Sequence, residues 1–278
     1  MIEIETEDVT RFYALYDAAN GAPTAEQIQR EYLDVGTAGL RRLTQARNVN
    51  AENIAHALAT TPELYTKART CLAALPRIQT RLDRTFDNLV EIYPEAARPP
   101  VTILVSRGRP AAIAGPGAGV QVALEAVCSD LAARFLGADI DNRFVNLIAH
   151  EYVHVQQPPE RANPTVLQRA LEEGVAEFIG ELIAGGVSNV AVHEAADGRE
   201  AEIETRFAGD LDKTDLSAWF DNTTEEDVGQ LGYWVGYRIV RAYYQNAPHK
   251  AAAIREMLHI TNAHAFLQRS GWRPGMVL

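Results

Sequence analysis

The sequence predicts an α-rich α+β protein, and three observations lead to that fold class. Between residues 10 and 93, apolar residues recur at spacings of three and four, which is the period of amphipathic helices. Residues 101–105 form a β-branched run bounded by Pro and Gly, which is typical of a strand. Two more apolar-periodic stretches, around residues 144–155 and 170–178, predict further helices. We therefore expect a predominantly helical chain with a small β-sheet.

The N-terminal part is expected to be helical almost throughout. Pro62 stands at the first position of one predicted helix, where its fixed φ suits the helix and no N–H donor is needed. We expect the stretch from Pro62 to Tyr93 to break near Pro76, since proline interrupts a helix interior. Residues 98–100, Arg-Pro-Pro, mark a boundary. The sequence thus predicts a helical N-terminal part, residues 1–98, packed as one compact unit on a second part, residues 99–278.

The second part opens with two predicted strands, at residues 101–105 and 120–123, separated by a glycine-rich loop at residues 115–119. No GK[ST] sequence follows, so this is not a phosphate-binding loop. The later strand could form a sheet edge that pairs with an extended chain, or it could belong to a plain structural hairpin. Asp139 or Asp141 is expected to cap the helix that comes next.

That helix contains the sequence HEYVH at residues 150–154. Residues four apart share one helix face, so His150 and His154 can present two imidazole nitrogens to one metal ion, with Glu151 beside them. A zinc ion held by two histidines and one further ligand keeps a position for water, whose pKa it lowers to about 7. Glu151 can then take the proton of that water. The alternative is a polar patch without metal, but the apolar flanks favour burial, and buried imidazoles need partners.

A third ligand is required, and the chain offers two candidates. Glu160 lies six residues after His154, but Pro158 and Pro159 force a turn of their own before it. Glu173 lies on the next predicted helix, with Glu177 one turn further along. Glu173 is therefore the expected metal ligand, and Glu177 is expected to accept the N–H of a ligand histidine. The alternative for these glutamates is a solvated acidic face.

Two tyrosines in a later helical stretch, Tyr233 and Tyr237, stand one turn apart beside a strip formed by Gly232 and Gly236. A tyrosine hydroxyl can donate a hydrogen bond to the oxyanion that forms during hydrolysis, so both are candidate catalytic residues. Packing in the core is the alternative for each. Two histidines near the C-terminus, residues 259 and 264, are rival donors.

The composition restricts the partners. A formal net charge of −11 argues against nucleic acid. No apolar run reaches the roughly 18 residues that a membrane span needs, and the first residues have no basic and apolar signal segment. As written the chain would be cytoplasmic, whereas a trimmed precursor would place it in the periplasm. Cys71 and Cys128 would then form a disulfide, and in the cytosol both would be buried thiols.

HEYVH followed by EEGVAEF resembles the gluzincin group of zinc peptidases, in which a glutamate ligand and a second acidic residue follow HExxH on a later helix. Four further stretches, TEDVTRFYALYDAA, REYLDVGTAGL, YPEAARPPVTILVSRGRP and LGYWVGYRIVRAYY, are similar to a family of predicted zinc-dependent proteases described as a domain of unknown function. Together they span residues 6–244, most of the length of the chain. The resemblance implies a zincin-like catalytic part, one zinc ion per chain, and a peptide or protein substrate.

The sequence predicts peptide-bond hydrolysis by a zinc metalloprotease, with zinc on His150, His154 and Glu173 and with Glu151 as the base. Two alternatives remain open. One is a zinc-binding or regulatory protein of the same fold without turnover, and the other is a structural helical domain in which HExxH is accidental.

Overall fold

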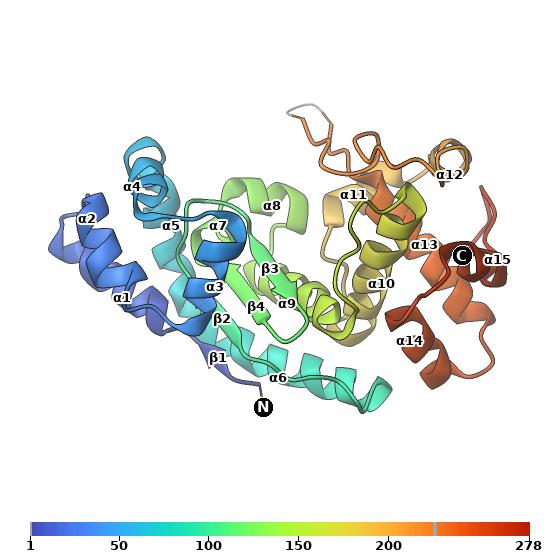
Figure 1. The fold of residues 1–278 in the computed structure, drawn as a ribbon, viewed down its shortest axis with the longest axis horizontal. Coiled ribbons are helices and arrows are strands. Elements are labelled where there is room, and N and C mark those ends of the chain that lie inside the picture. The colour runs from blue at the N-terminus through green and yellow to red at the C-terminus, as the bar shows by residue number, and fades with distance from the viewer. Residues whose placement is uncertain (1, 225–226) are drawn as a thin grey trace.

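The structure is a computed structural model that describes residues 2–224 and 227–278. These residues form a predominantly helical chain with one four-stranded mixed sheet, which confirms the predicted α-rich α+β class. The first helices lie on the left of Figure 1 and the last helices on the right, with the sheet and two long helices between them.

The chain before residue 93 is helical, as predicted, apart from one short strand. Its elements in order are β1 (Ile4–Glu5), α1 (Glu7–Ala18), α2 (Ala25–Ile28) continued by a π-helical turn (Gln29–Leu33), α3 (Ala38–Arg47), α4 (Ala51–Thr60), α5 (Pro62–Cys71), a 3-10 turn (Leu72–Ala74) and α6 (Leu75–Ile92). Pro62 begins α5, and the break predicted near Pro76 lies at the 3-10 turn just before it. The strand β1 was not predicted.

The sheet has the strand order β1-β2-β4-β3, with β2 at Val101–Leu104, β3 at Ala112–Gly115 and β4 at Gly119–Ala123. β1 and β4 pair with β2 in parallel, whereas β3 pairs antiparallel to β4. The expected loop at residues 115–119 is therefore a tight turn inside a hairpin whose first strand, β3, was missed. The suggestion that residues 120–123 form a sheet edge is wrong, because β4 lies between β2 and β3 and the edge strand is β3.

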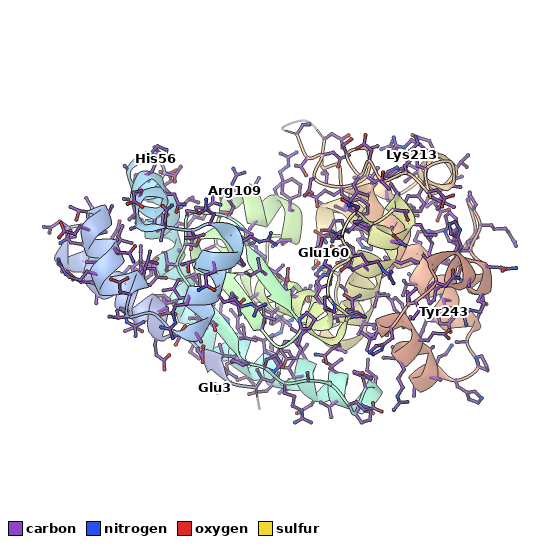
Figure 2. The ribbon with its side chains drawn as sticks, viewed as in Figure 1. Glu3, His56, Arg109, Glu160, Lys213 and Tyr243 are labelled. Atoms are coloured by element: carbon purple, nitrogen blue, oxygen red, sulfur yellow. A yellow bond between two sulfur atoms is a disulfide. The ribbon has the colours of Figure 1, made fainter. Side chains whose placement is uncertain are left out.

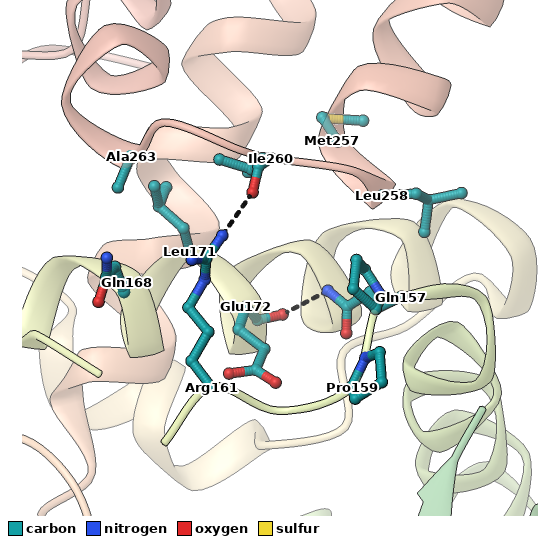
Figure 3. Close-up of a pocket in the computed structure, with 11 residues that line it drawn as sticks. Gln157, Pro159, Arg161, Gln168, Leu171, Glu172, Met257, Leu258, Ile260 and Ala263 are labelled. Carbon is teal, nitrogen blue, oxygen red and sulfur yellow. Dashed lines mark hydrogen bonds between the residues drawn. The ribbon is translucent and has the colours of Figure 1, made fainter. Parts of the chain in front are cut away.

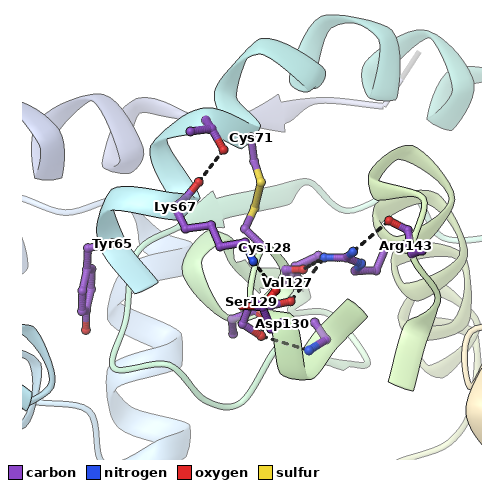
Figure 4. Close-up of a disulfide and its surroundings, with 12 residues drawn as sticks. Tyr65, Lys67, Cys71, Val127, Cys128, Ser129, Asp130 and Arg143 are labelled. Atoms are coloured by element: carbon purple, nitrogen blue, oxygen red, sulfur yellow. Dashed lines mark hydrogen bonds and ion pairs between the residues drawn. A yellow bond between two sulfur atoms is a disulfide. The ribbon is translucent and has the colours of Figure 1, made fainter. Parts of the chain in front are cut away.

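A disulfide links the helical N-terminal part to the segment before the long central helix. Cys71, at the end of α5, is bonded to Cys128, which follows α7 (Leu124–Val127) and precedes α8 (Asp130–Leu136). Arg143 of the central helix donates from Nη1 to the carbonyl of Val127, at 2.7 Å, and from Nε to that of Gly137, at 3.0 Å. The disulfide segment is thus attached to the start of the central helix (Figure 4).

The central helix, α9 (Ile140–Gln156), packs on β3 and β4 on one side and on α10 (Val166–Ala184) on another. Asp139 is its N-cap, and its side chain accepts from the N–H of Asn142 at 2.8 Å, as one of the two predicted caps. Asp141 instead pairs with Arg77 of α6 at 2.6 Å.

Glycines allow α10 to approach both of its neighbouring helices. A Cβ added at Gly180 would lie 3.3 Å from Cα of His150 on α9. A Cβ at Gly236 of α13 (Leu231–Asn246) would lie 1.8 Å from the carbonyl oxygen of Ala170, and one at Gly174 would lie 2.1 Å from the carbonyl carbon of Gly236. The close approach predicted for Gly236 is therefore made to α10, whereas Gly232 faces the ring of Phe220.

The remaining helices complete the C-terminal side of the molecule. They are α11 (Val190–Ala196), α12 (Glu200–Ala208), α14 (Lys250–Leu258) and α15 (Ala263–Ser270). Within the part of the chain that the structure describes, no helix is both long and apolar enough to cross a membrane.

Candidate metal centre

The two histidines of HEYVH share one face of α9, as the spacing of four predicts. His150 is 4% exposed, and the Nε2 atoms of His150 and His154 lie 3.2 Å apart. Both Nε2 atoms therefore point to one location between α9 and α10. The apolar residues around them, including Ile148 and Val153, are fully buried.

Glu173 of α10 brings a carboxylate to the same location. Its Oε2 lies 3.4 Å from Nε2 of His150 and 3.2 Å from Nε2 of His154, and the residue is 7% exposed. These three residues each offer one ligand atom, and the three atoms lie within 4.8 Å of one another. Sequence reasoning chose the same three residues.

Glu177, one turn along α10, supports His150 from its other side. Its Oε2 lies 2.9 Å from Nδ1 of His150, and it accepts from the hydroxyl of Ser188 at 2.6 Å. The backbone N–H of Asn189 donates to Oε1 at 2.9 Å, and Nε2 of His193 lies 3.5 Å from the same oxygen. Glu177 is fully buried, and the hydrogen bonds from Ser188 and Asn189 offset the desolvation of its charge.

Gln157 has the corresponding role beside His154. Its amide Nε2 donates to the carbonyl of Glu172 at 2.9 Å, so its Oε1 must accept, and it lies 2.6 Å from Nδ1 of His154. A hydrogen on Nδ1 leaves the Nε2 lone pair of that ring free to bind a metal. Each histidine is thus oriented through its Nδ1 by a neighbouring oxygen.

Burial and charge act against each other in this cluster. Burial raises the pKa of Glu173, but the charge of His154 and a hydrogen bond with His150 outweigh it and hold that pKa well below its ordinary value. Burial lowers the pKa of His150, but hydrogen bonds to Glu173 and Glu177 outweigh this effect and raise it to about 10. Without metal, the cluster is therefore a network of buried ion pairs.

The carboxylate of Glu151 follows His150 on α9 and lies beside this cluster. Within residues 2–224 and 227–278, no group donates a hydrogen bond to it in the structure. Burial raises its pKa, and the positive charges of His154 and His150 partly offset that rise. A desolvated carboxylate beside the histidine pair is a stronger base than one in water.

The structure separates the two candidate tyrosines. The ring of Tyr233 lies 6.2 Å from that of His150, and its pKa is raised by burial and by the negative charges of Glu173 and Glu151. The hydroxyl of Tyr237 instead donates to Oε2 of Glu181 at 2.6 Å. Tyr233 therefore adjoins the cluster, whereas Tyr237 is hydrogen-bonded on another side of α10.

The other sequence candidates lie away from the three ligand atoms. Glu160, labelled in Figure 2, is exposed and pairs with Arg169 of α10. His259 faces the carbonyl of Arg255 at 3.0 Å, and His264 pairs with Asp212 at 2.7 Å on the surface. Nη1 of Arg169 also lies 3.4 Å from Oε1 of Glu173, so Arg169 contacts both Glu160 and Glu173.

The sequence predicted Glu177 as the acceptor beside a ligand histidine but gave no indication of the other residues that orient the cluster. Ser188, Asn189 and His193 follow α10 and reach Glu177 only because the chain turns back after that helix. Nothing in their local sequence indicates this contact. The position of Gln157 could have indicated its contact. It stands three residues after His154, where a side chain at the helix end can reach back to that ring.

Three comparisons with known proteins bear on the identity of the chain. The family described as gliding motility protein GldB matches residues 199–274, which is less than half of the chain. The matched stretch contains α12 to α15, and so includes Tyr233 but none of the three candidate ligands. No curated protein and no solved structure matches the chain.

This finding corrects the resemblance drawn from the motif. The expected membership of a gluzincin or related zinc-protease family is wrong, and so is the protease function that followed from it, because the family that matches is a gliding motility family. HExxH and a later ExxxE involve few residues on two helices. They specify a set of ligand atoms, and such a set does not specify a family.

Proposed function

We propose that the chain binds one zinc ion through His150, His154 and Glu173. The observation that carries the proposal is the triangle of ligand atoms, with edges of 3.2, 3.2 and 3.4 Å. In a tetrahedral site with Zn–N and Zn–O distances near 2.0–2.1 Å, neighbouring ligand atoms lie about 3.3 Å apart. The donor set, two neutral imidazoles and a carboxylate, is one that zinc takes in catalytic sites.

We propose further that the site activates water, so that the protein is a zinc-dependent enzyme. A zinc ion with three protein ligands would lower the pKa of a water at its fourth position to about 7. Glu151 would take the proton, since its carboxylate is desolvated and has no hydrogen-bond donor among the described residues. Tyr233 would donate its hydroxyl hydrogen to a substrate oxygen that gains negative charge. In this proposal the sheet, α9 and α10 form a zincin-like arrangement.

Hydrolysis of an activated ester tests water activation without a natural substrate. We expect the zinc-loaded protein to hydrolyse p-nitrophenyl acetate faster than the same protein after chelation, and readdition of zinc to restore the rate. His154→Ala should abolish the zinc-dependent part of the hydrolysis rate. Glu160→Gln is the matched control, because Glu160 lies outside the triangle of ligand atoms, and it should keep that part of the rate. Equal rates with and without zinc would overturn the enzymatic proposal and leave zinc binding to be judged separately.

The family match favours a second candidate function, a role in gliding motility. We infer this role only from the match over residues 199–274 and from the description of the matching family. Deletion of the gene should then impair motility, and the wild-type gene should restore it. Restoration by a His150→Ala gene as well would show that this role does not need the metal centre. Unchanged motility in the deletion strain would contradict the candidate.

A further inference from the structure

A pocket of about 310 Å³ lies beside the metal centre, between α10, the loop after α9, and the end of α14 with the start of α15. Its deep walls are apolar, since Leu171, Met257 and Leu258 line it and each is no more than 2% exposed. This volume corresponds to about ten waters and lies at the lower end of the roughly 300–1,000 Å³ of small-molecule sites. The pocket is therefore of a size for one small molecule with an apolar body.

The same pocket carries two opposite charges. Glu172 of α10 is half-buried there, and its carboxylate accepts no hydrogen bond from the described residues; its nearest cation is Nη1 of Arg169, at 3.5 Å. Arg161 lines the pocket too, and its Nη2 donates to the carbonyl of Ile260 at 3.2 Å (Figure 3). Its remaining N–H groups have no acceptor among the described residues. Both charged side chains thus line one pocket.

We propose that this pocket binds a free apolar α-amino acid. The ammonium group would pair with Glu172, the carboxylate would pair with Arg161, and the side chain would contact the apolar walls. An apolar amine would use only the first charge, and an apolar acid only the second. The amino acid is the class of small molecule that matches both charges and the apolar surface together. None of the three candidate metal ligands lines the pocket, so this proposal does not depend on zinc.

Calorimetric titration of the full chain with L-phenylalanine tests the proposal, with three comparison compounds. Phenethylamine lacks the carboxylate, hydrocinnamate lacks the amine, and glycine lacks the apolar group. We expect L-phenylalanine to bind at least about tenfold more tightly than each of them, because each loses one charge-assisted or apolar contact. Binding of phenethylamine or hydrocinnamate as tight as that of L-phenylalanine, or no binding of L-phenylalanine, would overturn the proposal.

Two variants assign the charges. Glu172→Gln should weaken L-phenylalanine about tenfold or more and leave hydrocinnamate unchanged, whereas Arg161→Gln should weaken L-phenylalanine and leave phenethylamine unchanged. Glu52→Gln, an exposed glutamate on α4, is the matched control and should bind as the wild type does. Thermal unfolding shows that each variant is folded before titration. Wild-type affinity for L-phenylalanine in either pocket variant would contradict the assignment.

Discussion

Oε2 of Glu177 lies 2.9 Å from Nδ1 of His150, on the ring edge away from Nε2 and the other ligand atoms. The carboxylate therefore fixes the tautomer that leaves Nε2 unprotonated for a metal. Because Glu177 also accepts from Ser188 and Asn189, its own position is set by the loop that follows α10.

The first prediction follows from that contact. Glu177→Ala should weaken zinc binding about 10- to 100-fold, since His150 loses the acceptor that orients it. Competition with a chromophoric chelator measures this affinity. Glu181→Gln, on the same helix but bonded to Tyr237, is the matched control and should bind zinc as the wild type does. Equal affinities for all three proteins would remove the supporting role of Glu177.

The second prediction concerns Glu151. Glu151→Gln keeps the size of the side chain but cannot accept a proton, so zinc should remain bound while zinc-dependent ester hydrolysis falls about 10²- to 10⁴-fold. Zinc content and the hydrolysis rate are measured on the same sample. A variant that keeps the wild-type rate with its zinc in place would show that Glu151 is not the base.

The third prediction is a pH dependence of zinc binding. The pKa of His150 is about 10 without metal, so at pH 7 its imidazole is protonated, and zinc must displace that proton. Apparent affinity should therefore rise with pH up to about 10, roughly tenfold per pH unit for each proton released. Calorimetry in two buffers of different ionisation enthalpy counts the released protons. Affinity that does not change between pH 6 and 9 would contradict the network of ion pairs.

The same raised pKa has a consequence for the metal-free protein. Protonated His150 stabilises the folded state. This contribution to the free energy of unfolding is complete below pH 6.5, the ordinary pKa of histidine, and is lost as the pH rises to about 10. Zinc stabilises the folded state by binding to it, so loading should offset this loss at high pH.

The fourth prediction tests the close packing that holds α10 in place. Gly236→Ala would put a methyl group 1.8 Å from the carbonyl oxygen of Ala170, so α13 must move, and we expect a loss of about 1–3 kcal/mol in the free energy of unfolding. Gly209→Ala is the matched control, because its Cβ would meet no atom nearer than 3.4 Å. Urea unfolding measures the free energy of unfolding of both variants and of the wild type. Similar midpoints for both variants would mean that α10 and α13 do not pack this closely.

Local patterns predicted much of the fold and the centre of the site. The spacing of His150 and His154 places both on one helix face, and the cap at Asp139 and the first turn at Pro62 follow from backbone chemistry within a few residues. The choice of Glu173 over Glu160 rested on the two prolines after the helix. In the structure, Glu160 is exposed and Glu173 is among the three grouped ligand atoms.

Contacts between distant segments could not be predicted in this way. The strand β3, AIAG, has one β-branched residue and is held by pairing with β4, and β1 is a two-residue strand held by β2. Tyr233 and Tyr237 are one turn apart, and the rotation of α13 against α10 decides which of them adjoins His150. That rotation is set by the glycine contacts between the two helices.

Zinc stoichiometry in the wild type and two glutamate variants tests the central claim most directly. After incubation with zinc and dialysis, mass spectrometry should find about one zinc per chain in the wild type and in Glu160→Ala, and far less in Glu173→Ala, which removes one of three ligands. Wild-type protein with almost no zinc, or variants in which Glu160→Ala loses the metal while Glu173→Ala keeps it, would contradict the proposed site.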